Sequence, residues 1–426
     1  MQFEKKLGLG GSVAITVGAV IGVGLFVIVG PMGAKSGSWL PLAFAVAAVP
    51  AIIGTLVACA LGGTIPTDAG GFYYTKLLFG RYPATIASTL VIIGAMGAMM
   101  TVSIGVADYV GMYFPSLPRP AVAIGMILLA WLVNQIGIMA STGFQIVTVV
   151  QLITGILLVI IAALLGGAGP DFSQGLPKGM PGFMEASVIA MLTYTGWNIV
   201  GEMGDEIKNP RRNIPLTIIF GLGIVILLYV GIGWVVCGTL TVQEMSESKV
   251  AVLDTALRYL PKWTTHYINL AAFSAAITSV NAVFLAVPRE FSALAEEGIL
   301  PKWIMKFNPK RQTFPVSIAL IALAGCLLTW INFNPETWGM FCVAGLLSAN
   351  VFFSIGSMRL PKLFPDQVAA AAFPIRKSWL YPSGILGGIF SLAFAGMAFY
   401  FFKPIILVTG ILLALALVMA WSSRPK

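Results

Sequence analysis

Long apolar stretches follow one another along the whole chain, each separated from the next by a short polar or proline- and glycine-containing segment. A hydrocarbon core about 30 Å thick is crossed by roughly 20 apolar residues in helical form. The apolar pattern is nearly continuous within each stretch, unlike the alternation over roughly ten residues that is typical of a transmembrane barrel. The twelve predicted spans are residues 11–34, 39–62, 84–114, 120–139, 143–166, 185–205, 213–238, 264–295, 314–332, 336–358, 380–401 and 403–421.

Composition supports an integral membrane protein. Hydrophobic residues make up 58% of the 426 residues and charged residues only 10%, whereas about 25% of the residues in soluble domains are charged. The four cysteines lie inside apolar stretches without metal-ligand spacing, so we expect reduced structural thiols and no metal site. We find no Ser/His/Asp set, no HExxH and no P-loop. The sequence therefore predicts an all-α membrane protein that is neither an enzyme nor an ATP-driven pump and needs no cofactor.

Basic residues are unevenly divided between the two sides of the predicted spans. With the N-terminus inside, 18 of the 25 lysines and arginines fall in cytoplasmic segments and 7 outside. Cytoplasmic loops are enriched in these residues, so we predict both termini in the cytoplasm and a cell membrane, the inner membrane of a prokaryote. The net charge of +9 then reflects topology, and we expect no nucleic-acid partner. The oligomeric state stays open.

Two predicted spans at corresponding places carry residues that interrupt a helix. The first contains Gly18, Gly22 and Gly24, and the sixth contains Thr193, Thr195, Gly196 and Asn198. If the chain is divided into two halves of five spans each, the sixth span is the counterpart of the first. Matching breaks in two halves are typical of transporters built from inverted repeats, whose binding site lies near the bilayer midplane.

An unwound turn inside a membrane exposes backbone groups that can bind a zwitterion. Where the first span opens at 21–24, the N–H groups of the following half-helix point into the cavity and favour a carboxylate. Where the sixth span opens at 192–196, freed carbonyls can accept from an ammonium. The alternative is that Gly18 and Gly22 serve helix packing, as small residues four apart often do.

Four motifs resemble the amino acid, polyamine and organocation transporter superfamily, in particular amino acid permeases of the L-type amino acid transporter branch. They are GAVIGVGLF at 18–26, PTDAGGFYYTKLLFG at 66–80, YTGWN with DEIKNPRRNIP at 194–215, and PREFSALAEEGILPKWIMKFNP at 288–309. Together they cover the chain from Leu7 to Pro315 in the right order. Beyond Ser317 the resemblance is one of hydropathy alone.

The resemblance implies a leucine-transporter-like fold of five plus five inverted helices followed by two more, with helices 1 and 6 discontinuous. It also implies that the substrate carboxylate binds the amides of Gly22, Val23 and Gly24, and that the substrate amine binds the carbonyls of Val20, Leu192 and Thr195. The implied organisation is a cytoplasmic segment at 1–10, a first repeat at 11–166, an extracellular loop at 167–184, a second repeat at 185–358, a cytoplasmic loop at 359–379, two helices at 380–421 and a cytoplasmic end at 422–426.

Two positions depart from the family pattern. Leu192 stands where relatives usually carry an aromatic residue that caps the pocket, and Gln151 stands where many proton-coupled relatives carry a lysine. An uncharged amide cannot perform the same proton cycle. Three coupling modes follow: exchange or facilitated transport without an ion, a sodium ion near the carbonyls of Gly18 and Ile21 with the hydroxyls of Thr278 and Ser279, or a relocated proton site.

Further polar residues within the predicted spans are candidates for lesser roles. Thr101 and Ser103 either contact substrate or bond carbonyls of their own helix. Glu202 is a candidate proton carrier, because ionisable groups at membrane depth are costly. Asp205, Glu206 and Arg289 are candidates for a cytoplasmic ion-pair gate, with surface pairing as the alternative.

The sequence thus predicts a secondary transporter for small to medium neutral amino acids. The backbone of Ile21, Thr193 and Gly196 would join the binding groups named above, leaving side chains to select the substrate's R group. A cationic amino acid or amine antiporter is the first alternative, although no acidic cluster opposes the expected pocket in sequence. An amino acid sensor that keeps the fold without transport is the second.

Overall fold

The computed structural model describes residues 7–22, 24–67, 69–136, 138–196, 207–331, 333–371 and 377–423. Within these ranges the secondary structure is helical, apart from isolated bridges that join Leu7 to Ile207 and Asn308 to Thr313. The helices of eight or more residues are α1 (Leu9–Val20), α2 (Gly24–Ser36), α3 (Leu40–Thr64), α4 (Gly70–Phe79), α5 (Arg81–Gly111), α6 (Arg119–Ile136), α7 (Ile138–Leu165), α8 (Gly179–Thr193), α9 (Pro210–Cys237), α11 (Ala251–Tyr259), α12 (Thr264–Glu296), α13 (Pro315–Leu328), α14 (Pro335–Ser357), α17 (Lys377–Phe401) and α18 (Pro404–Ser422). The shorter helical segments are η1 (Gly37–Trp39), η2 (Phe172–Gln174), α10 (Val242–Glu247), η5 (Lys302–Met305), η6 (Thr329–Ile331), α15 (Leu360–Leu363) and α16 (Pro365–Ala369).

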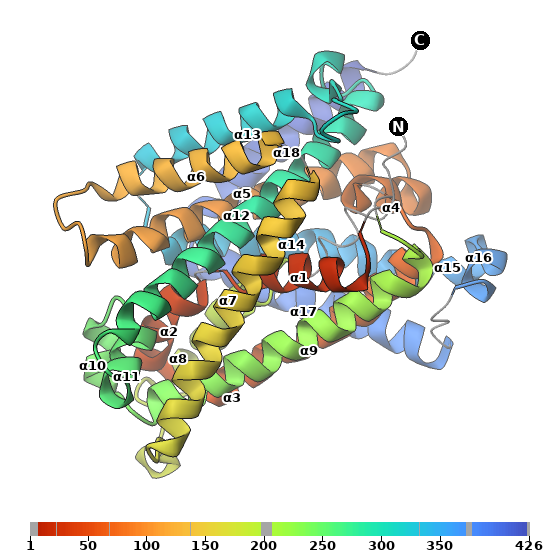
Figure 1. Cartoon of the computed structure of the whole chain (residues 1–426). Coiled ribbons are helices and arrows are strands. Elements are labelled where there is room, and N and C mark those ends of the chain that lie inside the picture. Colours follow the sequence, from red (N-terminus) through yellow and green to blue (C-terminus); the bar gives the residue numbers. More distant parts are fainter. Residues whose placement is uncertain are drawn as a thin grey trace.

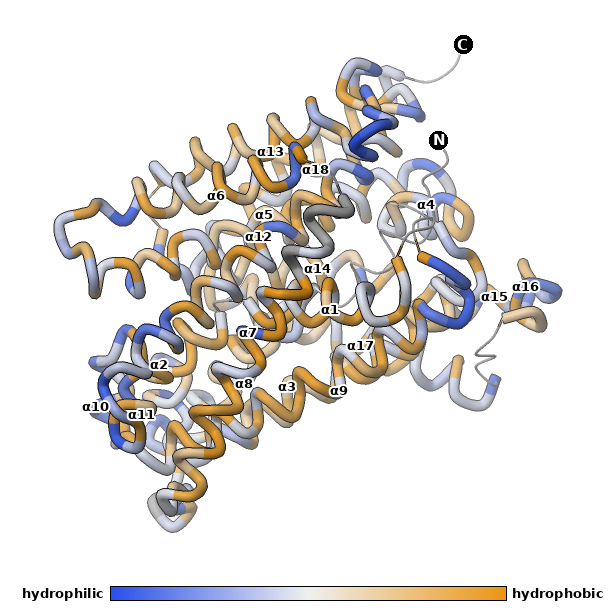
Figure 2. Tube along the Cα trace, in the orientation of Figure 1, coloured by the Kyte–Doolittle hydropathy of each residue, from blue (hydrophilic) through white to orange (hydrophobic). Residues whose placement is uncertain are grey.

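The long helices run between two polar ends of the molecule. Figure 1 shows α10 and α11 at one end and α4, α15 and α16 at the other. Figure 2 shows hydrophilic residues gathered at these ends and hydrophobic residues along the shafts of α3, α7 and α9. An apolar belt between two polar caps is the surface that a bilayer requires.

Nine helical runs in the described chain are long and apolar enough to cross a membrane. The hydropathy pattern predicts twelve spans, and the difference has three sources. The run Gly24–Thr64 joins α2, η1 and α3, the helices Leu9–Val20 and Pro315–Ile331 fall below the length required, and the predicted span 185–205 is described only as far as Gly196.

Local sequence signals explain where several helices begin. Asn209 takes a left-handed conformation with φ 47°, and Pro210 follows as the first residue of α9, where a missing N–H has no cost. Asn334 accepts a hydrogen bond from the amide of Thr337 and caps α14. Thr241 and Glu244 form a capping box that starts α10.

The first two helices lie inside the bundle. α1 contacts α7, α9 and α12, while α2 contacts α8, α10 and α9. Side chains of both helices are buried in the main hydrophobic core, including Ile15, Val17, Leu25 and Ile28. The first two helices therefore lie at the centre of the bundle, and later helices surround them.

The end of the bundle that carries α4 is held together by a buried carboxylate. Glu290 of α12 is fully buried and accepts hydrogen bonds from the amide of Gly71 in α4, at 2.9 Å, and from the hydroxyl of Ser88 in α5. A Cβ atom at position 71 would lie 2.6 Å from Glu290 Oε1, so the second glycine of the 66–80 motif is required for this contact. α4 is also joined to the residue that follows α12 through the Lys76–Glu297 ion pair.

Candidate functional site

The first predicted span is interrupted in the centre of the protein. α1 ends at Val20, and α2 begins at Gly24. The amide of Gly22 donates to the carbonyl of Val20 at 2.9 Å, which closes a tight turn. A Cβ atom at Gly22 would lie 2.9 Å from Ser279 Oγ and 3.1 Å from Val102 Cγ2. Glycine at this position therefore lets α5 and α12 approach the turn closely.

The end of α8 lies beside this turn. α8 ends at Thr193, and the turn that follows brings Gly196 to φ +106°, a conformation that L side chains rarely adopt. A Cβ atom at Gly196 would lie 3.0 Å from the carbonyl oxygen of Ala19. The backbones of the two segments that the sequence marks as interrupted are thus in direct contact.

A cavity lies between these two backbone segments and the shafts of α5, α12 and α14. Its volume, taken as the space open to the centre of a water molecule, is about 80 Å³. One water needs roughly 10–15 Å³ on this measure, so a small solute fits. The lining residues are small, aliphatic or hydroxyl-bearing: Ala19, Val20, Gly22, Gly24, Val91, Ala95, Ala98, Thr101, Val102, Leu192, Thr193, Thr195, Gly196, Ser279, Ala282, Val283, Ala286 and Leu346.

Helix ends of opposite polarity meet at this cavity. The last residues of α1 and α8 and the first residue of α2 all line it. The C-terminal end of a helix carries a partial negative charge and the N-terminal end a partial positive charge, each about half an elementary charge. The arrangement therefore offers both poles to one small solute while the described lining contains no charged side chain.

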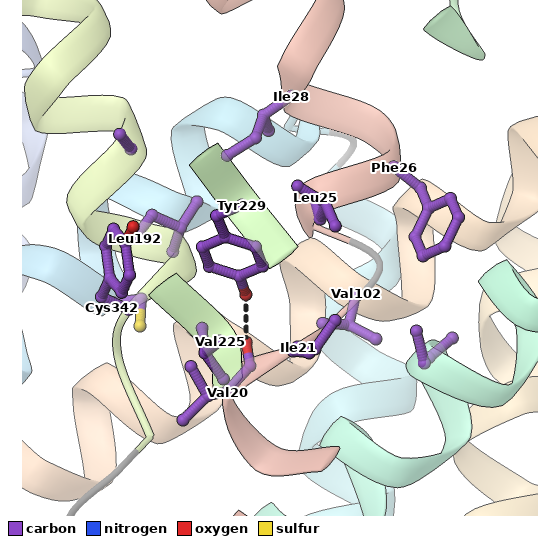
Figure 3. Close-up of a cluster of buried hydrophobic side chains, with 14 of the residues drawn as sticks. Val20, Ile21, Leu25, Phe26, Ile28, Val102, Leu192, Val225, Tyr229 and Cys342 are labelled. Carbon is purple, nitrogen blue, oxygen red and sulfur yellow. Dashed lines mark hydrogen bonds between the residues drawn. The ribbon is translucent and has the colours of Figure 1, made fainter. Parts of the chain in front are cut away.

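A tyrosine that sequence analysis did not select joins the two helix ends. The hydroxyl of Tyr229 in α9 lies 3.0 Å from the carbonyl oxygen of Val20 and 2.8 Å from that of Thr193, and its single proton is shared between them. Figure 3 shows the bond to Val20 within a cluster that also contains Leu192. In the sequence, Tyr229 stands out only as a polar group in the middle of an apolar span. A buried tyrosine hydroxyl usually has a hydrogen-bond partner, so such a position is a signal that could have been followed.

The residues expected to bind a carboxylate differ in their surroundings. Gly22 uses its amide in the turn described above, so a carboxylate would have to replace that bond. Gly24 is the first residue of α2, and within the described part of the chain a Cβ atom there would have only the Thr193 methyl within 4 Å, at 3.8 Å. Ile21 is buried and its amide donates to Val17. Val23 lies outside the described residues.

The residues expected to bind an amine also have local partners. The carbonyl of Leu192 accepts from both the amide and the hydroxyl of Thr195, at 3.2 Å and 2.6 Å. Thr195 Oγ1 also lies 3.2 Å from the sulfur of Cys342 in α14. The carbonyl of Val20 has two lone pairs but already serves Tyr229 and Gly22.

Thr101 and Ser103 behave differently from one another. Thr101 lines the cavity, and its hydroxyl donates to the carbonyl of Gly97 in its own helix, at 2.9 Å, and lies 3.2 Å from that of Pro335. Ser103 is fully buried and does not line the cavity, and its hydroxyl has no partner within the part of the chain that the structure describes.

The oxygens expected near a coupling cation lie together. The hydroxyl of Ser279 donates to the carbonyl of Gly18 at 2.8 Å, and that of Thr278 lies 3.2 Å from the same oxygen. These contacts place two side-chain oxygens of α12 against the end of α1. Gln151 instead donates to the carbonyl of Tyr267 at 3.2 Å, and its Oε1 is buried without a partner among the described residues.

The candidate gate is described only in part. Arg289 is buried on α12, directly before Glu290. Glu202, Asp205 and Glu206 lie outside the described residues. Within the described ranges, no group of three or more histidine, cysteine, aspartate or glutamate side chains could hold a metal ion.

A profile of the amino acid permease family matches residues 7–422, almost the whole chain. The chain belongs to this family. The resemblance seen in the four sequence motifs is therefore confirmed, and this permease is a multi-span membrane transporter for amino acids rather than an enzyme.

Relatives of this permease are named for different substrates. It is 26% identical over 313 residues to an uncharacterized transporter of Mycobacterium tuberculosis, a match that covers 72% of this chain and 70% of the relative. It is 23% identical over 397 residues to the branched-chain amino acid permease BcaP of Bacillus subtilis, with 88% and 84% covered. It is 26% identical over 360 residues to the vacuolar cationic amino acid transporter 4 of Arabidopsis thaliana, with 78% and 59% covered.

Proposed function

We propose that this permease carries small to medium neutral amino acids by alternating access, with the zwitterion held by the backbone of the two interrupted segments. The observation that carries the proposal is the convergence of α1, α2 and α8 on one cavity, where Gly196 contacts Ala19 and Gly24 lies opposite Thr193. A carboxylate at the start of α2 and an ammonium at the ends of α1 and α8 would each meet the complementary pole.

The cavity wall supports neutral substrates. Its side chains are aliphatic or carry hydroxyls, and the described lining offers no carboxylate to a second ammonium or a guanidinium. A substrate charge buried without a partner would cost several kcal/mol. An aliphatic R group instead gains by leaving water. The branched-chain permease among the relatives agrees with this choice.

A cationic amino acid or amine antiporter is the second candidate. It is favoured by the similarity to plant transporters that are named for cationic amino acids. The two candidates differ in whether arginine or putrescine competes for the uptake of labelled alanine or leucine into proteoliposomes. Competition by arginine or putrescine would show that the substrates are cationic rather than neutral amino acids.

The architecture that goes with this proposal has twelve spans in the leucine-transporter-like arrangement. The protein would lie in a cell membrane with both termini on the cytoplasmic side. The repeats are 11–166 and 185–358. Support comes from the division of basic residues and from the interruption between α1 and α2. Cysteine labelling from either side of the membrane, at α10 and at α16, would test the orientation.

Coupling has three candidate forms: exchange without an ion, sodium symport and a relocated proton site. The oxygens of Gly18, Thr278 and Ser279 fit a sodium ion, because carbonyls at the end of a half-helix bind Na⁺ in such transporters. Gln151 cannot carry a proton between states, and its described hydrogen bond goes to Tyr267. Glu202 is the remaining candidate for a proton.

The test of the function is ligand binding followed by flux. A ligand that binds only the folded protein stabilises it by about 2.7 kcal/mol at one hundred times its Kd, so alanine or leucine should raise the unfolding temperature of the detergent-purified protein. Saturable counterflow exchange in proteoliposomes should follow. Stabilisation without flux would indicate a sensor, and neither stabilisation nor flux would contradict the proposal.

A further inference from the structure

Two leucines line the cavity, and each packs against a glycine of a neighbouring helix. Leu192 of α8 lies against Gly339 of α14, and Leu346 of α14 lies against Gly94 of α5. The other described lining residues are glycine, alanine, serine, threonine or valine, so these leucines are the largest side chains in the described lining. Their positions therefore set how much room a substrate side chain has.

The two glycines differ in what a larger residue would meet. A Cβ atom at Gly339 would lie 2.3 Å from Leu192 Cδ2 and 3.4 Å from its Cδ1 and Cγ, so the three nearest atoms all belong to one flexible side chain. A Cβ atom at Gly94 would instead lie 2.8 Å from the backbone nitrogen of Leu346. Alanine at 339 can be accommodated by moving Leu192 alone, whereas alanine at 94 requires helices to separate.

The direction in which Leu192 would move follows from its surroundings. Its backbone is held at the end of α8, where its carbonyl accepts the two hydrogen bonds from Thr195. The side chain is 7% exposed and borders the cavity. Because protein interiors are densely packed, the open space next to this side chain is the cavity itself. Alanine at 339 would therefore push Leu192 into the substrate's space.

We propose that Gly339 is a substrate-size determinant of this permease, acting through Leu192. Because residue 339 has no side chain, the Leu192 side chain can pack against α14 and leave the cavity open. Branched neutral amino acids such as leucine then fit beside Leu192. Gly339 is a positioning residue, since it acts on the substrate through its neighbour. This inference rests on the proposed function, because it takes the cavity as the amino acid site.

The experiment compares leucine with alanine as ligands of the native protein, Gly339→Ala, and Gly339→Ala combined with Leu192→Ala. Affinities are measured by thermal-shift titration of detergent-purified protein and by counterflow exchange. A methylene in an apolar pocket changes discrimination about 10–200-fold, so Gly339→Ala should lower leucine affinity at least about 10-fold relative to alanine. The added Leu192→Ala change should restore leucine binding. Gly223→Ala is the matched control and should keep the native ratio, because a Cβ atom at this glycine of α9 would have no atom of the described residues within 4 Å.

Each outcome separates the two proposals. Native protein that binds neither amino acid would overturn the proposed function. Native protein that binds both, with an unchanged leucine-to-alanine ratio in Gly339→Ala, would overturn the role of Gly339 and leave the site intact. Should Gly339→Ala not fold, Leu192→Ala with native Gly339 serves as the second test. It should raise the affinity for phenylalanine relative to alanine, and an unchanged ratio there would also refute the inference.

Discussion

The hydroxyl of Tyr229 lies 3.0 Å from the carbonyl oxygen of Val20, the last residue of α1. The same hydroxyl lies 2.8 Å from the carbonyl of Thr193, the last residue of α8. One side chain of α9 therefore joins the two helix ends that border the cavity. The hydroxyl thereby holds in place the two helix ends that the proposed site uses.

Replacing Tyr229 with phenylalanine should loosen both helix ends while the ring keeps its packing. Two buried carbonyls would each lose a hydrogen bond, and losing a buried partner costs about 1–3 kcal/mol. We expect a lower unfolding temperature without substrate and weaker binding of neutral amino acids. Thermal-shift titration measures both effects.

Tyr194→Phe is the control for this change. The ring of Tyr194 lies 5.1 Å from that of Tyr229, centroid to centroid, and its buried hydroxyl has no hydrogen-bond partner among the described residues. Removing this hydroxyl should leave stability and binding near native values. Equal losses in the two variants would show that the bonds from Tyr229 to the helix ends are not responsible.

Gly24→Leu should abolish amino acid binding without preventing folding. The new side chain would leave α2 towards the cavity, where, among the described residues, only the Thr193 methyl lies within 4 Å of the Cβ position. It would fill the space in front of the first amides of α2. The measurement is ligand-induced stabilisation of protein that elutes as a monodisperse species, with Gly223→Leu on the exposed face of α9 as the control. Native affinity in Gly24→Leu would place the carboxylate elsewhere.

Exchange uptake should proceed without sodium and without a pH gradient. Gln151 is uncharged and donates to Tyr267, so we expect Gln151→Lys to leave uptake independent of an imposed pH gradient. Counterflow in proteoliposomes, with sodium and pH varied separately, measures this. Stimulation by sodium would instead support a sodium site at Gly18. Ser279→Ala should then remove the stimulation. A proton-dependent Gln151→Lys variant would show that position 151 reaches the coupling site.

Ser88→Ala should destabilise the end of the bundle near α4. Its hydroxyl donates to the buried carboxylate of Glu290, and hydrogen bonds to charged groups contribute about 1.5–3 kcal/mol. Thr89→Ala is the matched control, because among the described residues the Thr89 hydroxyl bonds only the carbonyl of Thr85 in its own helix. The unfolding temperature of the two variants is the measurement, and equal values would refute a special role for the Glu290 contact.

Helix positions could be predicted well from the sequence. The spans expected at 84–114, 213–238 and 264–295 correspond to α5, α9 and α12 within a few residues. The interruption expected at 21–24 lies between α1 and α2. These features depend on local properties, namely continuous hydropathy and the conformational freedom of glycine, so neighbouring residues in the chain suffice to reveal them.

Partnerships across the bundle could not be predicted in the same way. The family pattern assigns Gln151 to coupling but does not reveal its hydrogen bond to Tyr267, because helix rotation and crossing decide which side chains meet. Tyr229 carries only a general signal, a polar group in an apolar span, and Gly339 is like the small residues that commonly serve helix packing. Neither signal indicates which residues would be its partners.

The sequence by itself determined that this chain is a helical membrane protein with glycine-rich breaks, because burial in a bilayer requires apolar helices and a break requires residues that tolerate it. Only the tertiary structure decided that Gly196 contacts Ala19, that Tyr229 joins Val20 to Thr193, and that Leu192 lies against Gly339. The reason is physical: these contacts join residues far apart in the chain, and their distances are set by how the helices pack.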